Sequence, residues 1–116
     1  MASGKRAARD ARILDELYAV IESRKDADPE SSRTAQLFER GVAKIAQKVG
    51  EEAVETLIEA MRGDKERLAE ESADLLYHLL VLWADQKLPP DAVWKALRKR
   101  RETSKIVEQA AEETAG

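Results

Sequence analysis

The sequence contains no cysteine and only one histidine among its 116 residues. Without cysteine the chain can form neither a disulfide framework nor a thiol-based catalytic site. Glycine and proline are also scarce, at five and three residues, and aromatic residues make up 4% of the chain. Alanine, leucine, glutamate, lysine and arginine dominate the remainder, and these residues favour helices over strands. We therefore expect an all-α fold, an antiparallel bundle of four to five helices.

The chain also lacks a strong net charge and a long apolar run. Its 20 basic and 23 acidic residues nearly cancel, which leaves a formal net charge of −3, so no basic field indicates nucleic acid as a partner. The longest apolar run, Leu79 to Ala84, is too short to span a bilayer, and the start of the chain has no apolar signal segment. We expect a cytoplasmic protein with neither a nucleic-acid nor a membrane partner.

The length fits a single domain over residues 1–116, with residues 1–9 as a loose leader and 102–116 as a tail. Apolar periodicity, together with proline, glycine and aspartate punctuation, predicts helical segments between them. These segments cover residues 10–23, 32–39, 42–61, 64–86 and 91–101. On the segment 42–61 the predicted core positions are Val42, Ile45, Val49, Ala53, Thr56, Leu57 and Ala60.

Two acidic pairs lie at equal distances on either side of Gly63. Glu52 and Glu55 precede this glycine by eleven and eight residues, and Glu71 and Asp74 follow it by eight and eleven. The i,i+3 spacing places the members of each pair on one side of a helix. If the chain folds back at Gly63 into an antiparallel helix pair, Glu55 faces Glu71 about 12 Å from the turn. Glu52 then faces Asp74 at about 16 Å.

Four carboxylates in one small volume repel one another unless cations occupy the site. Ligands that offer only hard oxygen atoms select Mg²⁺ or Mn²⁺ over zinc. A solvated face of ordinary glutamates is the alternative, but the mirrored placement beside an apolar stripe favours a metal site. Glu51 lies further round the same helix, where it either supports the site from outside the ligand set or is simply solvated.

Other polar residues near the acids have two interpretations each. Lys44 and Lys48 precede Glu52 by about two helical turns and one, and they either neutralise a phosphate chain or form helix ion pairs. His78 is placed either as a hydrogen-bonded core residue or as a group that contacts a metal ligand or substrate. The basic cluster that begins at Arg98 complements a helix C-terminus and is compatible with phosphate binding.

The segment Leu75–Trp83 is apolar nearly all round. A small bundle cannot cover every side of such a helix, so we expect a homodimer formed through this segment.

With these residues in view, the chain resembles the phosphoribosyl-ATP pyrophosphatase family of all-α nucleotide pyrophosphohydrolases, from about Leu14 to Ala110. The resemblance is carried by Thr34-Ala35-x-Leu37 followed by Gly41, and by the blocks KIAQKVGEEAVET, ESADLLYHLLVL and RKRRETSKI. It implies Mg²⁺-dependent hydrolysis of phosphoribosyl-ATP to phosphoribosyl-AMP and pyrophosphate, the second step of histidine biosynthesis. An α-helical homodimer would perform the reaction.

The resemblance also assigns roles to residues. The implied catalytic residues are the metal ligands Glu52, Glu55, Glu71 and Asp74, together with Glu51 as a group that orients water. The expected substrate contacts are Thr34, Lys44, Lys48, His78 and Arg98. The chain departs from the family pattern at Arg33, where an aromatic residue is usual, at Gln36, where lysine is usual, and at Lys105, where glycine is frequent. Two alternatives stay open: a house-cleaning nucleoside triphosphate pyrophosphatase that uses the same acids, and a non-catalytic helical interaction module.

Overall fold

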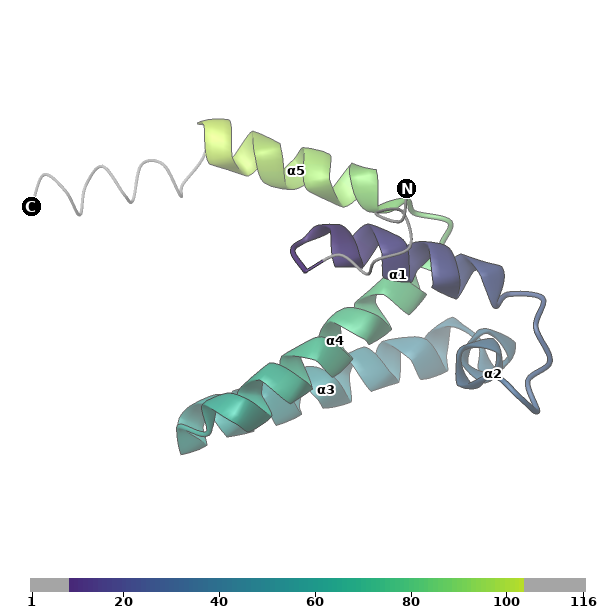
Figure 1. Ribbon diagram of the computed structural model, residues 1–116, viewed down its shortest axis with the longest axis horizontal. Helices are drawn as coiled ribbons and strands as arrows, with labels where there is room; N and C mark the ends of the chain where they lie inside the picture. The colour runs from purple at the N-terminus through teal and green to yellow at the C-terminus, as the bar shows by residue number, and fades with distance from the viewer. Residues whose placement is uncertain (1–8, 104–116) are drawn as a thin grey trace, which may run out of the picture.

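The computed structural model describes residues 9–103, which fold into five helices and no strand (Figure 1). The helices are α1 (Arg12–Ser23), α2 (Arg33–Arg40), α3 (Val42–Arg62), α4 (Lys65–Asp85) and α5 (Pro90–Thr103). The all-α prediction is confirmed, and each helix begins and ends close to its predicted bounds. The predictions for residues 1–8 and 104–116 lie outside the described part of the chain. No helix within residues 9–103 is long and apolar enough to cross a membrane.

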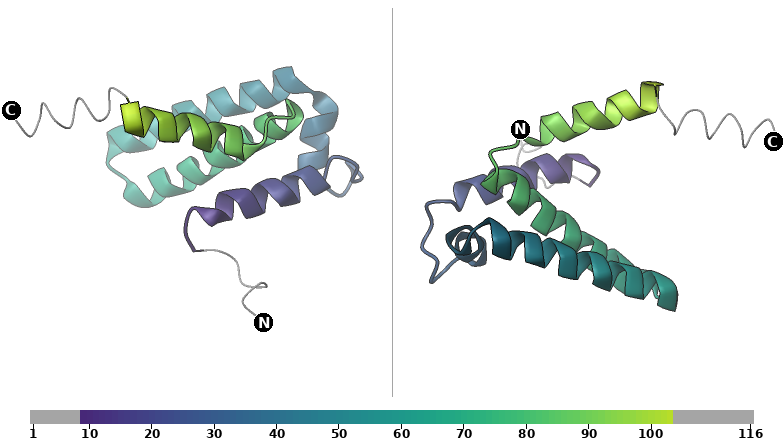
Figure 2. Two further views of the ribbon diagram at one scale, coloured as in Figure 1. Left: turned by 90° about the horizontal axis from the view of Figure 1, so that it is seen from above. Right: turned by 180° about the vertical axis from the view of Figure 1, so that it is seen from behind.

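The chain reverses direction at Gly63, as its sequence predicts. Gly63 caps α3 in the left-handed conformation (φ 76°), where a side chain would strain the backbone. The N–H groups of Gly63 and Asp64 donate to the carbonyls of Ala60 and Glu59 at 3.2 and 3.3 Å. The carboxylate of Asp64 then accepts a hydrogen bond from the N–H of Arg67 at 3.1 Å and caps α4. As a result α3 and α4 run side by side as an antiparallel hairpin (Figures 1 and 2).

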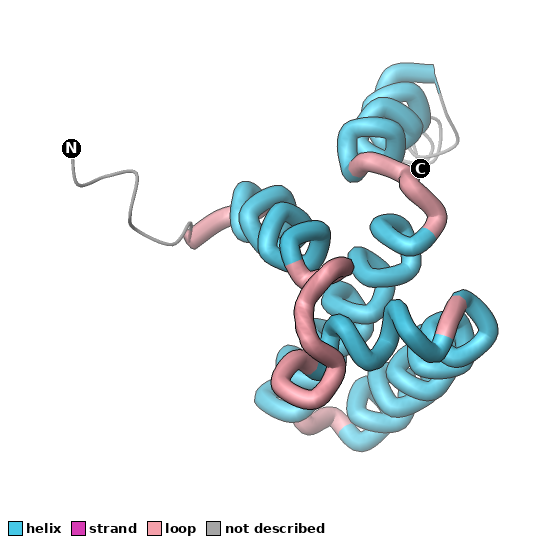
Figure 3. The backbone as a smooth tube through the Cα atoms, turned by 90° about the vertical axis from the view of Figure 1, so that its right-hand side faces the viewer, coloured by secondary structure: helices cyan, strands magenta, loops and turns pink. Residues whose placement is uncertain are grey.

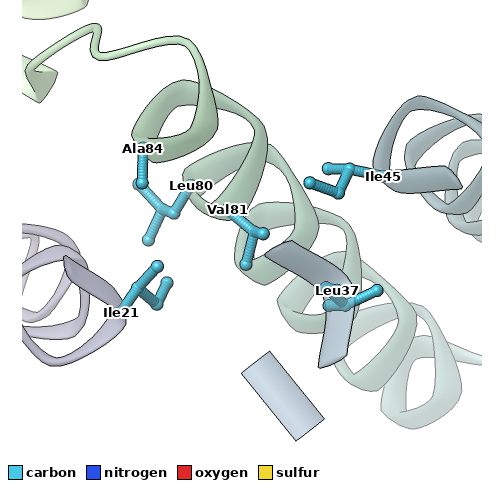
Figure 4. Packing of buried hydrophobic residues seen from close by; sticks show 6 residues of the cluster. All are labelled: Ile21, Leu37, Ile45, Leu80, Val81 and Ala84. Carbon is cyan, nitrogen blue, oxygen red and sulfur yellow. The ribbon is translucent and has the colours of Figure 1, made fainter. Parts of the chain in front are cut away.

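The hydrophobic core lies where α1 and α2 meet this hairpin (Figure 4). Helix α4 supplies half of the buried residues of this core, and α1, α2 and α3 supply one each. They are Ile21, Leu37, Ile45, Leu80, Val81 and Ala84. Burying one aliphatic side chain of this size contributes about 1.5–3 kcal/mol. The core therefore fixes the part of the hairpin formed by the start of α3 and the end of α4.

The predicted core positions of α3 are wrong at three residues, Val42, Leu57 and Ala60, all of which are exposed. Val42 and Leu57 are 47% and 64% exposed, whereas Glu52 and Glu59 are only 8% and 5% exposed. The reason is that α3 packs mainly against α4 and α2, which cover a narrow stripe of its surface. Two acids lie within that stripe, and the apolar residues beside it face outward.

Helix α2 follows a loop of residues 24–32 (Figure 3) and packs against α3 and α4. Ser32 caps the helix by accepting a hydrogen bond from the N–H of Ala35 at 3.1 Å. The amide of Gln36 donates to the carbonyl of Pro29 at 2.7 Å, which holds the loop against the helix. These bonds fix where α2 begins and hold the preceding loop in place.

Helix α5 continues from the end of α4 and diverges from the α3–α4 hairpin, with α1 to one side of it (Figures 1 and 2). The rings of Trp83 and Trp94 meet edge to face with centroids 6.0 Å apart. The indole N–H of Trp94 donates to Asp15 at 3.2 Å, and the hydroxyl of Tyr18 donates to the carbonyl of Leu88 at 3.0 Å. These contacts attach α5 to α1 and to the end of α4.

Candidate metal centre

The structure brings together three of the four predicted metal ligands. Glu52 and Glu55 extend from α3 and Glu71 extends from α4, and one carboxylate oxygen of each lies within 4.8 Å of the others. Glu52 is buried, Glu71 is half-buried and Glu55 is exposed. Asp74 lies outside this group, but its negative charge contributes to raising the pKa of Glu52. The cluster is thus open to solvent at Glu55 and buried at Glu52.

The carboxylates of the cluster disfavour one another's ionised form. Burial, followed by the charge and hydrogen bonding of Glu55, raises the pKa of Glu52. Desolvation, followed by the influence of Glu55 and then Glu52, raises the pKa of Glu71 to about 7. These raised pKa values mean that ionising all of the carboxylates of the cluster costs free energy. A bound cation would remove that cost.

The cluster fits a hard divalent cation. The buried Oε2 atom of Glu52 has no hydrogen-bond partner among the described residues. Buried polar atoms nearly always have a partner, so a missing ligand or ion is one explanation for the exception. The donor atoms are all carboxylate oxygens, which Mg²⁺ and Mn²⁺ prefer, and Mg²⁺ commonly keeps several waters beside one or two carboxylates.

Glu51 lies apart from the cluster. Its carboxylate accepts a hydrogen bond from the amide of Gln47 at 2.9 Å and pairs with Lys48 at 3.5 Å. The hydrogen bond from Gln47 and the charges of Lys48 and Lys44 lower its pKa. Lys48 therefore makes its helix ion pair with Glu51 rather than with Glu52. An ionised Glu51 can accept a hydrogen bond from water.

His78 is 4% exposed and lies inside the fold. Its Nδ1 atom is 2.8 Å from the backbone carbonyl oxygen of Asp74, and its ring contacts that of Tyr77 edge to face at 4.9 Å. Its Nε2 atom has no hydrogen-bond partner within the described chain. Thr34 is also engaged, because its hydroxyl shares a hydrogen bond of 2.6 Å with that of Tyr77. The predicted substrate contacts of His78 and Thr34 stay predictions.

The two lysines expected to contact phosphate line one pocket of about 420 Å³ beside α2 and α3. Two arginines that the sequence reasoning missed, Arg33 and Arg40, line the same pocket. Their spacing of seven residues on one helix places them on one face, and this is the signal that could have found them. Arg98 belongs to α5 and is not among the residues that line this pocket.

A buried acid near the turn was also missed. Glu59 is 5% exposed and pairs with Arg62 at 3.7 Å and with Arg67 at 3.5 Å. One of these arginines belongs to α3 and the other to α4, so Glu59 links the two helices close to their turn. Its position four residues after Glu55, about one helical turn further along α3, was the available signal.

Fold and site together define an all-α protein with a carboxylate cluster suited to a divalent cation. Residues 14–101 match the family model described as phosphoribosyl-ATP pyrophosphohydrolase, and the chain belongs to this family. It is 66% identical over 101 residues to a phosphoribosyl-ATP pyrophosphatase of Azospirillum brasilense, an alignment that covers 87% of this chain and 91% of the relative. A phosphoribosyl-ATP pyrophosphatase of Paramagnetospirillum magneticum is 58% identical over 102 residues, which cover 88% and 94% of the two chains. The family resemblance is therefore confirmed.

Proposed function

We propose that this protein hydrolyses phosphoribosyl-ATP to phosphoribosyl-AMP and pyrophosphate in histidine biosynthesis, with Mg²⁺ held at the carboxylate cluster. The observation that carries the proposal is the approach of Glu52, Glu55 and Glu71 within 4.8 Å, in a chain of this family. The names of the relatives support the choice of substrate.

Each acid has a distinct role in this proposal. Glu52 and Glu71 come from different helices, so the hairpin itself sets the distance between these two ligands. The exposed Glu55 and Asp74 complete the ligand set on the side that faces solvent, where a substrate phosphate can approach. Glu51, held by Gln47 and Lys48, orients the attacking water. When bound, Mg²⁺ would offset the phosphate charges and lower the pKa of that water.

We propose a homodimer, but the surface differs from the one expected. Helix α4 is not exposed all round, because Leu80 and Val81 are fully buried in the core. Exposed apolar side chains gather on α3 instead, with one more on α4. They are Val54, Leu57, Ile58, Met61 and Leu76. A second copy of the chain would cover this apolar surface, since clusters of this kind commonly mark interfaces.

The same proposal places the enzyme in the cytoplasm, with the nucleotide as its small-molecule partner and with no nucleic-acid or membrane partner. A house-cleaning pyrophosphatase would use the same acids, so substrate preference separates the two functions. Pyrophosphate release should be measured with phosphoribosyl-ATP and with ordinary nucleoside triphosphates. A higher kcat/KM for phosphoribosyl-ATP supports the biosynthetic role, and equal values would assign the chain to the house-cleaning alternative.

A further inference from the structure

The pocket between α2 and α3 has an unusual concentration of positive charge. Its six lining residues are Arg33, Gln36, Leu37, Arg40, Lys44 and Lys48. Four of these residues carry a positive charge, and none of the six is acidic. A concave surface lined by one sign of charge concentrates ions of the opposite sign.

Most of these cations have no ion-pair partner among residues 9–103. Lys48 pairs with Glu51 at 3.5 Å. Among residues 9–103, in contrast, no carboxylate lies within ion-pair distance of Arg33, Arg40 or Lys44. An anion that binds these three side chains would therefore break no existing ion pair of the described chain.

The start of α3 adds to this positive potential. Helix α3 begins at Val42, between the pocket residues Arg40 and Lys44. Gly41 precedes it with φ 91° and, within the described residues, offers no side-chain cap, and the first turn contains no acid. The unpaired N–H groups of a helix N-terminus carry a partial positive charge that favours phosphate.

The pocket and the carboxylate cluster lie along the same face of α3. Lys44, Lys48 and Glu52 are spaced four residues apart, which places them on one side of the helix. Along the axis, Lys44 is about 12 Å from Glu52, and Lys48 is about 6 Å from it. A phosphate bound at the cluster would thus be close to Lys48. A phosphate among Arg33, Arg40 and Lys44 would lie further from the cluster along α3.

Phosphoribosyl-ATP has phosphates at two separate ends, because the triphosphate and the added phosphoribosyl unit lie on opposite sides of the adenine ring. We infer that the pocket of Arg33, Arg40 and Lys44 binds the 5′-phosphate of the phosphoribosyl unit while the triphosphate lies at the carboxylates. This inference rests on the proposed function and extends it, since ATP has no group for this pocket. Arginine suits the task because its guanidinium can bind phosphate through two hydrogen bonds.

The double variant Arg33→Gln/Arg40→Gln tests this assignment. A charge-assisted hydrogen bond contributes enough for its loss to lower affinity roughly 10- to 150-fold. We expect the KM for phosphoribosyl-ATP to rise within that range, while kcat for phosphoribosyl-ATP and kcat/KM for ATP stay unchanged. Lys65→Gln is the matched control, because it removes one exposed cation at the first residue of α4, about 30 Å along the hairpin from the start of α3.

The outcomes separate this assignment from the proposed function. Equal losses with phosphoribosyl-ATP and ATP would mean that the pocket holds the triphosphate, and unchanged kinetics with both would mean that it holds neither; each result overturns the inference. If the wild-type protein releases no pyrophosphate from phosphoribosyl-ATP, the proposed function fails. Thermal stability in excess ribose 5-phosphate then tests the pocket by itself: protection of the wild type but not of the double variant supports it, and absence of protection overturns it.

Discussion

The hydroxyl oxygen of Thr34 on α2 lies 2.6 Å from that of Tyr77 on α4, 43 residues further along the chain. Tyr77 also contacts His78, whose Nδ1 atom lies 2.8 Å from the carbonyl oxygen of Asp74. The hydrogen bond therefore links one wall of the basic pocket to the α4 segment that carries the acids. Thr34 has a structural role that is independent of any contact with substrate.

Replacing Thr34 by valine removes this hydrogen bond and preserves the shape of the side chain. We expect the free energy of unfolding to fall by about 1 kcal/mol, the usual net contribution of one hydrogen bond. Urea unfolding of Thr34→Val, Tyr77→Phe and the double variant would measure the coupling between the two residues. Strictly additive losses would show that the hydroxyls do not interact.

Glu59 is predicted to stabilise the end of the hairpin through its two arginines. In Arg62→Gln/Arg67→Gln the buried carboxylate loses both ion pairs. The expected loss in unfolding free energy is about 1–2 kcal/mol, since a buried charge without a partner is costly but both arginines are largely exposed. Arg24→Gln, an exposed change without an ion pair among residues 9–103, serves as the control in urea unfolding. Equal stabilities of all three proteins would remove this role for Glu59.

The metal-free protein should lose stability as the pH rises. Glu71 has a pKa of about 7 in the folded state against 4.5 ordinarily, so the native state binds its proton more tightly than the unfolded state does. Its contribution to stability is complete below pH 4.5 and is lost as the pH rises toward 7. Glu71→Gln should flatten this decline in urea unfolding with a chelator present. Some decline should remain, because the pKa of Glu52 is raised as well. Identical profiles for the variant and the wild type would contradict the prediction.

The apolar surface of α3 predicts that a charge placed there weakens the dimer. Leu57→Glu should raise the dissociation constant of the dimer by about tenfold or more, because a carboxylate would be buried against apolar groups. Val20→Glu places the same charge on an exposed apolar position of α1 and should leave association unchanged. Sedimentation at micromolar concentration distinguishes these variants. A monomeric wild-type protein would refute the interface as a whole.

The sequence was most informative where the structure depends on residues that are close together in the chain. Gly63 and Asp64 predicted the turn and the cap of α4, and the mirrored acids predicted that Glu55 and Glu71 meet. Counting residues from the turn was less accurate for Asp74, which lies outside the closest group. Equal counts place two residues at one height, but side-chain direction and helix crossing decide which carboxylates meet.

Burial was harder to predict, because it depends on which helices cover α3. The periodicity of Val42 and Leu57 does not reveal that α4 covers the stripe containing Glu52 and Glu59. The bond between Thr34 and Tyr77 joins distant segments, and no local pattern contains it. The basic pocket likewise requires α2 to lie beside the start of α3.

The central claim is that the carboxylate cluster holds Mg²⁺ for hydrolysis of phosphoribosyl-ATP. The most direct test is Mg²⁺-dependent pyrophosphate release by the wild type, Glu55→Gln, Asp74→Asn and the control Glu70→Gln, whose exposed side chain precedes Glu71 in α4. The two ligand variants should remain helical and lose about a hundredfold or more in kcat/KM, because an amide removes ligand charge without altering packing. The control should match the wild type. Near-normal turnover of both ligand variants at limiting Mg²⁺ would contradict the account.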